Sequence, residues 1–222
     1  MRAAIYLTAS LALAPIGGQA APINTLANLF DGASLAIDHY DVHNWSLDSN
    51  VSDVAIDFGQ IMVQIQNSYE GFTLNYDFNN QLSISTAGSI DIDFSYSVTD
   101  FARPHFIGNV LELTDPLFSG SAPNSGSIVV TEDVFCGGPP GGYLVGQKRA
   151  EIDPDAGINT PVDAAQFLCK QDLWIEKHIV ITSEGSTVSL GDMHQTFIPV
   201  PATAALLALG LFGIRCTSRR AA

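Results

Sequence analysis

The most chemically suggestive cluster is His39-Tyr40-Asp41-Val42-His43, near the start of the chain. On a β-strand, His39, Asp41 and His43 would share one face, about 6.5–7 Å apart in steps of two residues. Two imidazoles and a carboxylate form a donor set that suits zinc or iron. Two-residue steps splay the side chains, and short motifs of this kind are common without a ligand. A polar strand face, or a loop near the start of the domain, is therefore the alternative that we favour over a metal site.

Two further groups of carboxylates deserve comparison with known chemistry. Asp91 and Asp93 share a face of a predicted strand, and a retaining glycosidase needs two carboxyl groups about 5–5.5 Å apart. Paired aspartates on a solvated strand are far commoner, so we do not expect a catalytic pair. Asp153 and Asp155 resemble the start of a calcium loop, because Ca²⁺ prefers oxygen ligands at alternating positions. The twelfth position of such a loop is Ala164 instead of Glu, which favours a turn. No cofactor is required, and calcium is the cation to test first.

The sequence contains no motif for a catalytic nucleophile. Gly-x-Ser-x-Gly and His-Glu-x-x-His are both absent, and we expect a protein that is not an enzyme. The aromatic residues Trp45, Tyr143 and Trp174 could stack on sugars, although such residues more often complete a core.

The elements that must position these residues are predicted to be β-strands. Apolar and polar residues alternate with period two, which is typical of antiparallel sheets with one face on a core. The clearest run is 89–98, whose even-numbered residues are all apolar. Other predicted strands are 61–66, 72–79, 82–85, 127–131, 174–182 and 186–190. Strands at this spacing predict a mainly β fold, an antiparallel β-sandwich or jelly roll.

Turn residues separate the predicted strands. Asn79-Asn80, Ala87-Gly88 and residues 183–185 are short enough to connect consecutive strands as hairpins. Residues 161–168 are predicted to form a short helix, with N-cap and first-turn signals at Thr160 and Pro161. Residues 26–36 fit either a short helix or a loop and strand.

Both ends of the chain carry transport signals. Residues 1–20 are predicted to be a secretory signal helix, in which Arg2 precedes an apolar stretch and small residues precede cleavage before Ala21. Residues 197–222 begin with an apolar stretch that ends at Ile214. Its length lies at the lower end of the spanning range of roughly 17–25 residues. We expect a transmembrane helix with its terminal arginines in the cytoplasm. The domain at 21–196 would then lie outside the inner membrane.

The C-terminal segment combines a Pro-x-Pro entry, a short apolar helix and an arginine cluster. The residues that carry this order are Pro199, Val200, Pro201, Ala202, Arg215, Arg219 and Arg220. The segment resembles the PEP-CTERM sorting tail of Gram-negative bacteria, and looks like its Val-Pro-Leu-Pro-Ala variant. It differs in the residue between the prolines and in an interruption of the arginine cluster at 216–218. The resemblance implies processing by an exosortase, a membrane transpeptidase, and a place at the cell surface or outside the cell.

The charge of the predicted exported domain excludes two classes of partner. All 23 Asp and Glu lie in it, but only five of the nine Lys and Arg. Such an acidic domain is unsuited to nucleic acid, whose phosphates require a basic surface. It is equally unsuited to docking on anionic lipid headgroups.

Two of the three cysteines, Cys136 and Cys169, lie in the predicted exported domain, where disulfides form. A zinc site would need two further ligands nearby. We therefore predict a Cys136–Cys169 disulfide, which stabilises the fold by roughly 3–4 kcal/mol in the chain-entropy model.

Three functions are compatible with the sequence. The first is a non-enzymatic surface or matrix protein, and the sorting tail implies a role alongside exopolysaccharide in a biofilm or envelope. The second is a carbohydrate-binding or carbohydrate-cleaving β-sandwich delivered by the same route. The third is a metal-binding module built on His39, Asp41 and His43.

Overall fold

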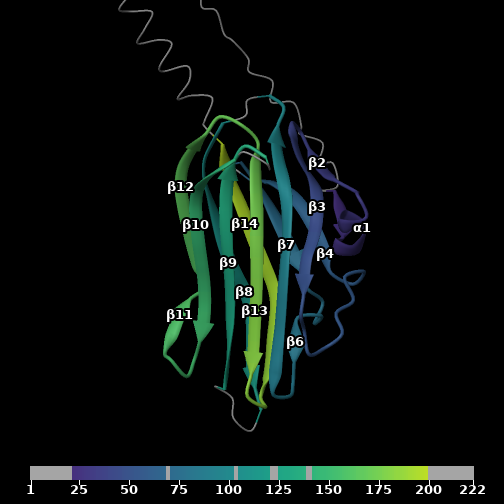
Figure 1. The fold of residues 1–222 in the computed structure, drawn as a ribbon, viewed down its shortest axis with the longest axis vertical. Helices are drawn as coiled ribbons and strands as arrows, with labels where there is room; N and C mark the ends of the chain where they lie inside the picture. Colours follow the sequence, from purple (N-terminus) through teal and green to yellow (C-terminus); the bar gives the residue numbers. More distant parts are fainter. Residues whose placement is uncertain (1–21, 69–70, 103–104, 121–124, 139–141, 200–222) are drawn as a thin grey trace, which may run out of the picture.

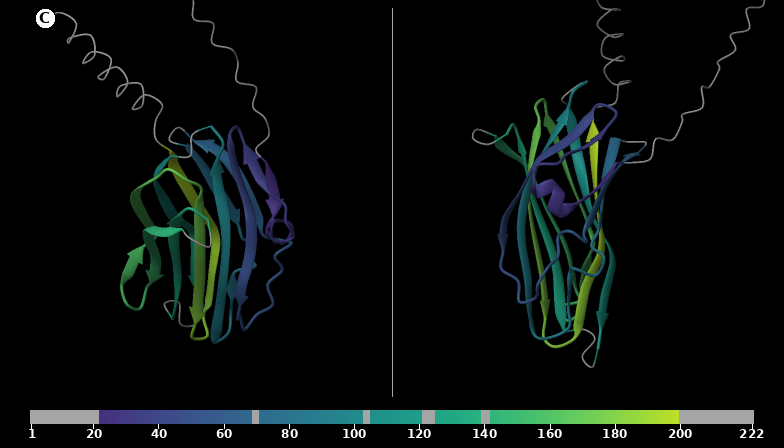
Figure 2. Two further views of the ribbon diagram at one scale, coloured as in Figure 1. Left: turned by 45° about the horizontal axis from the view of Figure 1, so that its top comes forward. Right: turned by 90° about the vertical axis from the view of Figure 1, so that its right-hand side faces the viewer.

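A computed structural model describes residues 22–68, 71–102, 105–120, 125–138 and 142–199. Within these ranges the chain is mainly β, with one short helix, and the strand pairings are antiparallel. The strands form two seven-stranded sheets that pack face to face (Figures 1 and 2). The predicted antiparallel β-sandwich is confirmed.

Each sheet mixes strands from distant parts of the chain. The back sheet, which lies behind in Figure 1, contains β1 (Ile23–Thr25), β4 (Met62–Ser68), β5 (Gly71–Asp77), β6 (Ser83–Ile84), β8 (Phe106–Ser119), β12 (Val162–Cys169) and β14 (Thr187–Pro199). The front sheet contains β2 (Leu35–Ile37), β3 (Tyr40–Asn50), β7 (Gly88–Asp100), β9 (Gly126–Cys136), β10 (Tyr143–Asp153), β11 (Ile158–Thr160) and β13 (Leu173–Ser183). The back sheet has the order β1-β4-β5-β14-β8-β12, with β6 also paired to β14. The front sheet has the order β11-β10-β9-β13-β7-β3-β2.

The core is the layer between the sheets. Alternate residues of a strand point to opposite faces, so every second residue of β7 is buried against the back sheet. Helix α1 (Leu26–Phe30) lies beside the sandwich (Figure 2), and buries Leu26 and Leu29. The Thr25 hydroxyl caps this helix by accepting a hydrogen bond from the Asn28 amide at 3.2 Å. Residues 26–36 therefore hold a helix followed by the start of β2.

The predicted strands are present, but three predicted hairpins are wrong. After Asn79-Asn80 the chain enters β6, which pairs with β14 instead of β5. Ala87-Gly88 leads from the back sheet into β7 of the front sheet, and residues 183–185 lead from β13 to β14 of the back sheet. Turn residues allow the chain to reverse, but they do not specify which sheet receives the next strand.

The predicted helix at 161–168 is also wrong, because this segment forms β12. It pairs with β8 at the edge of the back sheet, and its exposure alternates as in a strand. The backbone groups of β8 pair with residues 162–166 and with Cys169, and this tertiary pairing overrides the local helix signals. Thr160 ends β11 instead of capping a helix.

The β-sandwich extends past residue 196, which we predicted as the end of the domain. Phe197 is fully buried and pairs with Phe72 on one side and Asn109 on the other. Residues 197–199, assigned to the tail from sequence, therefore belong to β14. The remainder of the predicted tail and the predicted signal peptide lie outside the described residues. Across the described ranges, no helix is both long and apolar enough to cross a membrane.

Candidate functional site

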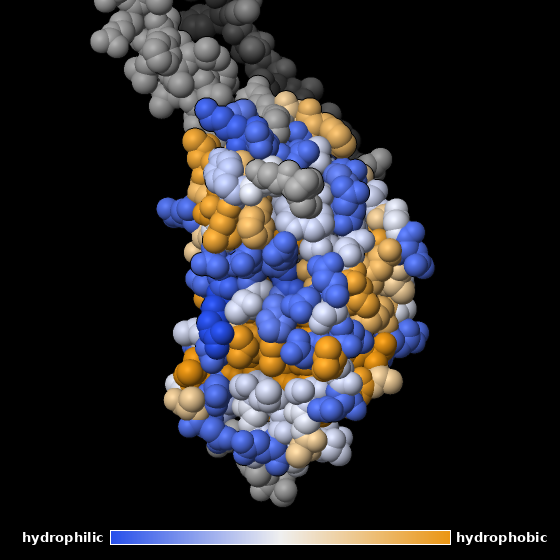
Figure 3. Space-filling model, viewed as in Figure 1, coloured by the Kyte–Doolittle hydropathy of each residue, from blue (hydrophilic) through white to orange (hydrophobic). Residues whose placement is uncertain are grey.

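The outer face of the front sheet carries polar and aromatic side chains in rows that run across the strands. On β13, Ile175 and Ile179 point into the core, so Trp174, Glu176 and His178 point outward. The register of β13 with β7 and β9 sets the neighbours of these three side chains. Hydrophilic side chains gather in a band across the middle of this face (Figure 3).

An aromatic row lies next to this polar band. Trp174 of β13 is directly opposite Phe135 of β9, and both side chains are half-buried. The indole Nε1 of Trp174 donates a hydrogen bond to Oε1 of Glu176 at 3.1 Å, which restrains the ring. An aromatic ring beside a carboxylate can stack on the apolar face of a sugar while the carboxylate accepts hydrogen bonds from its hydroxyl groups.

A row of carboxylates and amides runs parallel to the aromatic row. Glu176 is opposite Asp133 on β9, and Gln147 of β10 donates from Nε2 to Oδ1 of Asp133 at 2.9 Å. A shallow hollow of about 520 Å³ opens beside this row, a volume within the range of about 300–1,000 Å³ that small-molecule sites occupy. Its lining residues are Asp48, Ser49, Asp93, Phe94, Thr131, Asp133, Glu176, Lys177 and His178.

His178 also lies against two aspartates of β7. Its Nε2 is 3.0 Å from Oδ1 of Asp91 and 3.9 Å from Oδ1 of Asp93. The three potential ligand atoms lie within 4.8 Å of one another, and the side chains are about half exposed. One imidazole and two carboxylates form a donor set that suits Zn²⁺. Without an ion, His178 and Asp91 form an exposed pair of small energetic value.

The structure does not bring His39, Asp41 and His43 together as metal ligands. His39 Nε2 lies 3.6 Å from Oδ1 of Asp100, whereas His43 Nε2 lies 3.0 Å from the Thr99 hydroxyl. Asp41 is opposite Thr99 on β7. In the part of the chain that the structure describes, the three do not form a group close enough for one ion, whereas Asp91, Asp93 and His178 do. Of the two alternatives that we favoured, a polar strand face describes Asp41 and His43 of β3, whereas His39 lies in the turn before this strand.

Asp153 and Asp155 lie in the turn between β10 and β11. Oδ1 of Asp153 accepts a hydrogen bond from the Ala156 amide at 2.9 Å, as in an Asx turn. Asp155 is exposed at the tip of this turn. These contacts form a turn, which is the interpretation that we favoured over a calcium loop.

Cys136 and Cys169 form the predicted disulfide, with Cα atoms 5.5 Å apart. The bond joins β9 of the front sheet to β12 of the back sheet, and both residues are buried. It therefore clamps the two layers together. Of the predicted sorting motif, Pro199 is the last residue of β14. The other motif residues, Val200, Pro201, Ala202, Arg215, Arg219 and Arg220, lie outside the described residues, so the sorting tail stays a prediction.

The sequence identified part of the outer face and missed the rest. Trp174, Asp91 and Asp93 were candidates, but Asp133 and His178 were not. Period-two alternation over 174–182 already places His178 on the same face as Trp174. The missing information was that β13 lies between β7 and β9.

Of the other candidate sugar-stacking residues, Trp45 belongs to the core. It is buried and stacks on Tyr96 with ring centroids 4.4 Å apart. Tyr143 is exposed at the start of β10.

No family model and no curated protein matches the chain. Among solved structures, it is similar to TmCBM61 in complex with beta-1,4-galactotriose, with 12% identity over 69% of this chain and 88% of that chain, and a TM-score of 0.33. It is also similar to the xylan-binding module CBM15, with 9% identity over 74% of this chain and 96% of that chain, and a TM-score of 0.23. The enzymatically active domain of tailspike protein 4 from Bacteriophage CBA120 shares 12% identity over 68% of this chain and 19% of that chain, with a TM-score of 0.29. At these TM-scores the similarities assign no function to the chain.

Proposed function

We propose that this protein is an exported, non-enzymatic surface or matrix protein that binds a polysaccharide chain on the outer face of its front sheet. The observation that carries the proposal is the aromatic row of Trp174 and Phe135 beside the polar row of Glu176, Asp133 and Gln147. The aromatic row offers apolar area, and the polar row offers acceptors and an amide donor for hydroxyl groups.

The shape of this face favours a chain over a single sugar. The aromatic row crosses β9 and β13, and the polar row crosses β10, β9 and β13, which are neighbouring strands of the front sheet. Since neighbouring strands lie about 4.8 Å apart, the polar row is about 10 Å long. The hollow beside the rows is shallow and open to solvent, so a polymer can lie across it without inserting a free end.

Charge narrows the class of polysaccharide. The chain has a net charge of −14, and the hollow is lined by Asp48, Asp93, Asp133 and Glu176. Carboxylates at such density repel uronic acid and sulfate groups. We therefore infer that the ligand is a neutral polysaccharide or one that carries amino sugars.

Delivery to the cell surface follows from the two terminal signals. We propose that the signal peptide at 1–20 directs export across the inner membrane. The C-terminal helix then anchors the protein in that membrane until an exosortase processes the tail. Support for this step comes from the order of Pro199, Pro201, the apolar stretch and the arginines in the sequence.

Binding can be tested by affinity electrophoresis and calorimetry with neutral polysaccharides of different linkage. We expect Trp174→Ala to weaken binding by roughly 10-fold or more, because stacking and its buried area are lost. Tyr143→Ala is the matched control, since it removes an exposed aromatic ring that lies outside the two rows. Failure of the wild-type chain to bind any of these polymers would sink the proposal, as would equal binding by the Trp174 variant. Release of reducing ends would instead indicate an enzyme.

A divalent cation on the same face is a second candidate function, favoured by the geometry of Asp91, Asp93 and His178. Zinc titration of wild type and His178→Gln tests it, with the exposed His194→Gln on the back sheet as the control. Zinc bound equally by wild type and His178→Gln would exclude this site.

A further inference from the structure

Three charged side chains are buried in the middle of the core. Glu132 of β9, Lys148 of β10 and Lys177 of β13 are opposite one another on neighbouring strands and all point toward the back sheet. The side chains of all three are completely shielded from solvent. Lys148 Nζ is 2.5 Å from Oε1 of Glu132, and Lys177 Nζ contacts Oε2.

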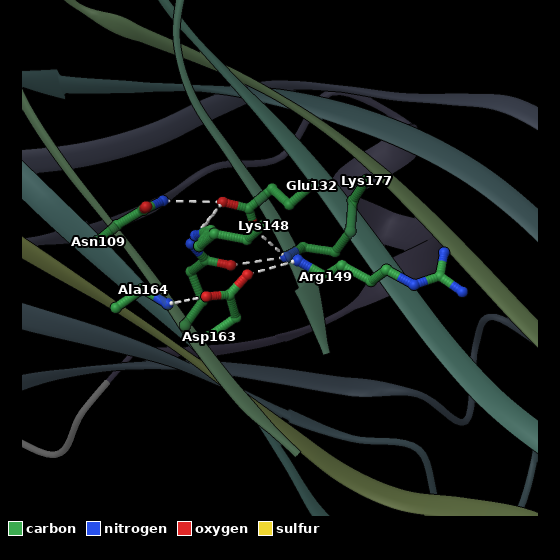
Figure 4. A network of polar contacts seen from close by, with 8 residues as sticks. Asn109, Glu132, Lys148, Arg149, Asp163, Ala164 and Lys177 are labelled. Atoms are coloured by element: carbon green, nitrogen blue, oxygen red, sulfur yellow. Dashed lines mark hydrogen bonds and ion pairs between the residues drawn. The ribbon is translucent and has the colours of Figure 1, made fainter. Parts of the chain in front are cut away.

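Two amides reach the same carboxylate from the back sheet. Nδ2 of Asn109 on β8 and Nε2 of Gln195 on β14 each donate to Oε1 of Glu132 at 2.8 Å. Figure 4 shows Asn109 and Lys148 converging on Glu132 from opposite layers. The two sheets therefore meet at a single buried carboxylate.

The charges in this cluster do not balance. Two buried ammonium groups contact one buried carboxylate, and the nearby charge of Asp163, which is only partly buried, also raises the pKa of Lys148. An excess charge in an apolar core is costly. Burial lowers the pKa of Lys148 to about 8 and also lowers the pKa of Lys177. Burial alone would raise the pKa of Glu132, but the two lysines lower it to about 2. Loss of a proton from Lys148 is thus the way to relieve the excess charge, and it produces a neutral amine.

Lys148 and Asn109 also each carry an unsatisfied polar atom. Among the described residues, neither Nζ of Lys148 nor Oδ1 of Asn109 has a hydrogen-bond partner with good geometry. Lys148 Nζ and Asn109 Nδ2 contact the same oxygen of Glu132, Oε1. The distance between these two nitrogens therefore cannot exceed the sum of their distances to that oxygen. An amine and a carboxamide, held together by a carboxylate in the buried core, are the components of an acyl transfer.

We propose that Lys148 and Asn109 form an intramolecular isopeptide bond, with Glu132 as the general acid–base. Nζ of neutral Lys148 attacks Cγ of Asn109, and the carbonyl electron pair moves to Oδ1. Glu132 accepts a proton from the attacking nitrogen and delivers it to Nδ2. The Cγ–Nδ2 bond then breaks, the carbonyl re-forms and ammonia leaves. No oxidant or cofactor is consumed.

The product removes the imbalance that the cluster starts with. Lys148 becomes a neutral amide, which leaves Lys177 and Glu132 as a balanced pair. The new bond ties β10 of the front sheet to β8 of the back sheet, in the same sense as the disulfide ties β9 to β12. Since water is excluded from the core, the amide is protected from hydrolysis.

Lys177 and Gln195 are a less suitable pair, although they are equally buried. Nζ of Lys177 already donates to Oε1 of Gln195 at 2.6 Å and also contacts Glu132. A lysine that donates to the amide oxygen directs protons, and not its lone pair, toward the carbonyl. Of the two lysine–amide pairs, the one with unsatisfied atoms among the described residues is Lys148 and Asn109.

The test is the mass of the purified chain after reduction of its disulfide, compared with the mass calculated for the same termini. We expect wild type to be lighter by about 17 Da, the mass of the ammonia lost in the acyl transfer. Peptide mapping should recover one branched peptide that joins Lys148 to Asn109. The full calculated mass, with both residues recovered unmodified, would overturn the proposal. A branched peptide that joins Lys177 to Gln195 would overturn the assignment.

Variants then separate the roles of the three residues. Asn109→Ala and Lys148→Arg should keep the full mass, and Glu132→Gln should abolish or greatly slow the loss. Asn109→Asp should lose water instead of ammonia, about 18 Da, because the same attack then expels hydroxide. Lys170→Met, which removes an exposed lysine, is the matched control and should show the same mass loss as wild type. Because the decisive measurement is made on wild type, a variant that fails to fold does not affect the result.

Discussion

Breaking the Cys136–Cys169 disulfide should cost the fold about 3.7 kcal/mol. The bond closes a chain separation of 33 residues, and the chain-entropy model gives about 3.7 kcal/mol for a loop of that length. Among the described strands, β12 lies at the edge of the back sheet and pairs only with β8, and the disulfide holds its last residue against the front sheet. The loss should therefore appear first as faster amide exchange along β12, ahead of global unfolding.

The assay is urea unfolding of the oxidised chain, repeated with reductant. A variant with Cys136→Ala and Cys169→Ala is the control, because reductant should not change its unfolding midpoint. The m-values show whether the unfolded chain becomes more expanded once the constraint is gone. A difference below about 1 kcal/mol between oxidised and reduced chains would refute the idea that the bond acts through the unfolded state.

Four further outcomes are expected. Glu132 has a pKa of about 2 in the folded chain against a usual 4.5, so its contribution is complete above about pH 4.5 and lost as pH falls through about 2. The loss, up to roughly 3 kcal/mol, is measured at both pH values by urea unfolding of Asn109→Ala with and without Glu132→Gln, because neither chain can form the proposed isopeptide bond. Phe197→Ala should destabilise by about 3–5 kcal/mol in thermal or urea unfolding, because this ring is buried in the sandwich and not in a membrane tail. His178→Gln should weaken zinc binding at least tenfold by calorimetry, since one of three ligands is lost. Replacing Pro199 and Pro201 together should block processing but not export, and intact mass of the protein from envelope and medium would report either result.

Strand faces could be predicted from the sequence, because alternation depends on local residue order alone. The run 89–98 became β7 with its apolar residues inward. The same alternation on β13 placed Trp174 outward, as a sugar-stacking residue requires. Pairing could not be predicted in the same way. Ala87-Gly88 looks like a hairpin turn but connects the two sheets, since any strand with one apolar face fits either layer.

The candidate site depended on strand pairing, which could not be predicted from the sequence. Asp91 and Asp93 were grouped from the sequence, but His178 reaches them from β13, far along the chain. The buried cluster of Glu132, Lys148 and Lys177 could have been detected in part from the local sequence. Lys177 occupies the same face of its strand as Ile175 and Ile179, and a lysine at a core position requires a buried partner. That partner, Glu132, comes from the neighbouring strand β9 and could not be named without the register.

The proposed polysaccharide face and the proposed isopeptide bond lie on opposite sides of the same strands. Glu132 points inward and Asp133 outward on β9, just as Lys177 and Glu176 do on β13. A covalent tie in the core would hold these strands at fixed spacing and so preorganise the outward side chains. Asn109→Ala removes the tie but leaves every outward side chain in place. If the tie only stabilises the fold, Trp174→Ala should lose the same factor of affinity in both backgrounds. If Trp174→Ala has no effect in the Asn109→Ala background, the isopeptide bond is what assembles the binding face.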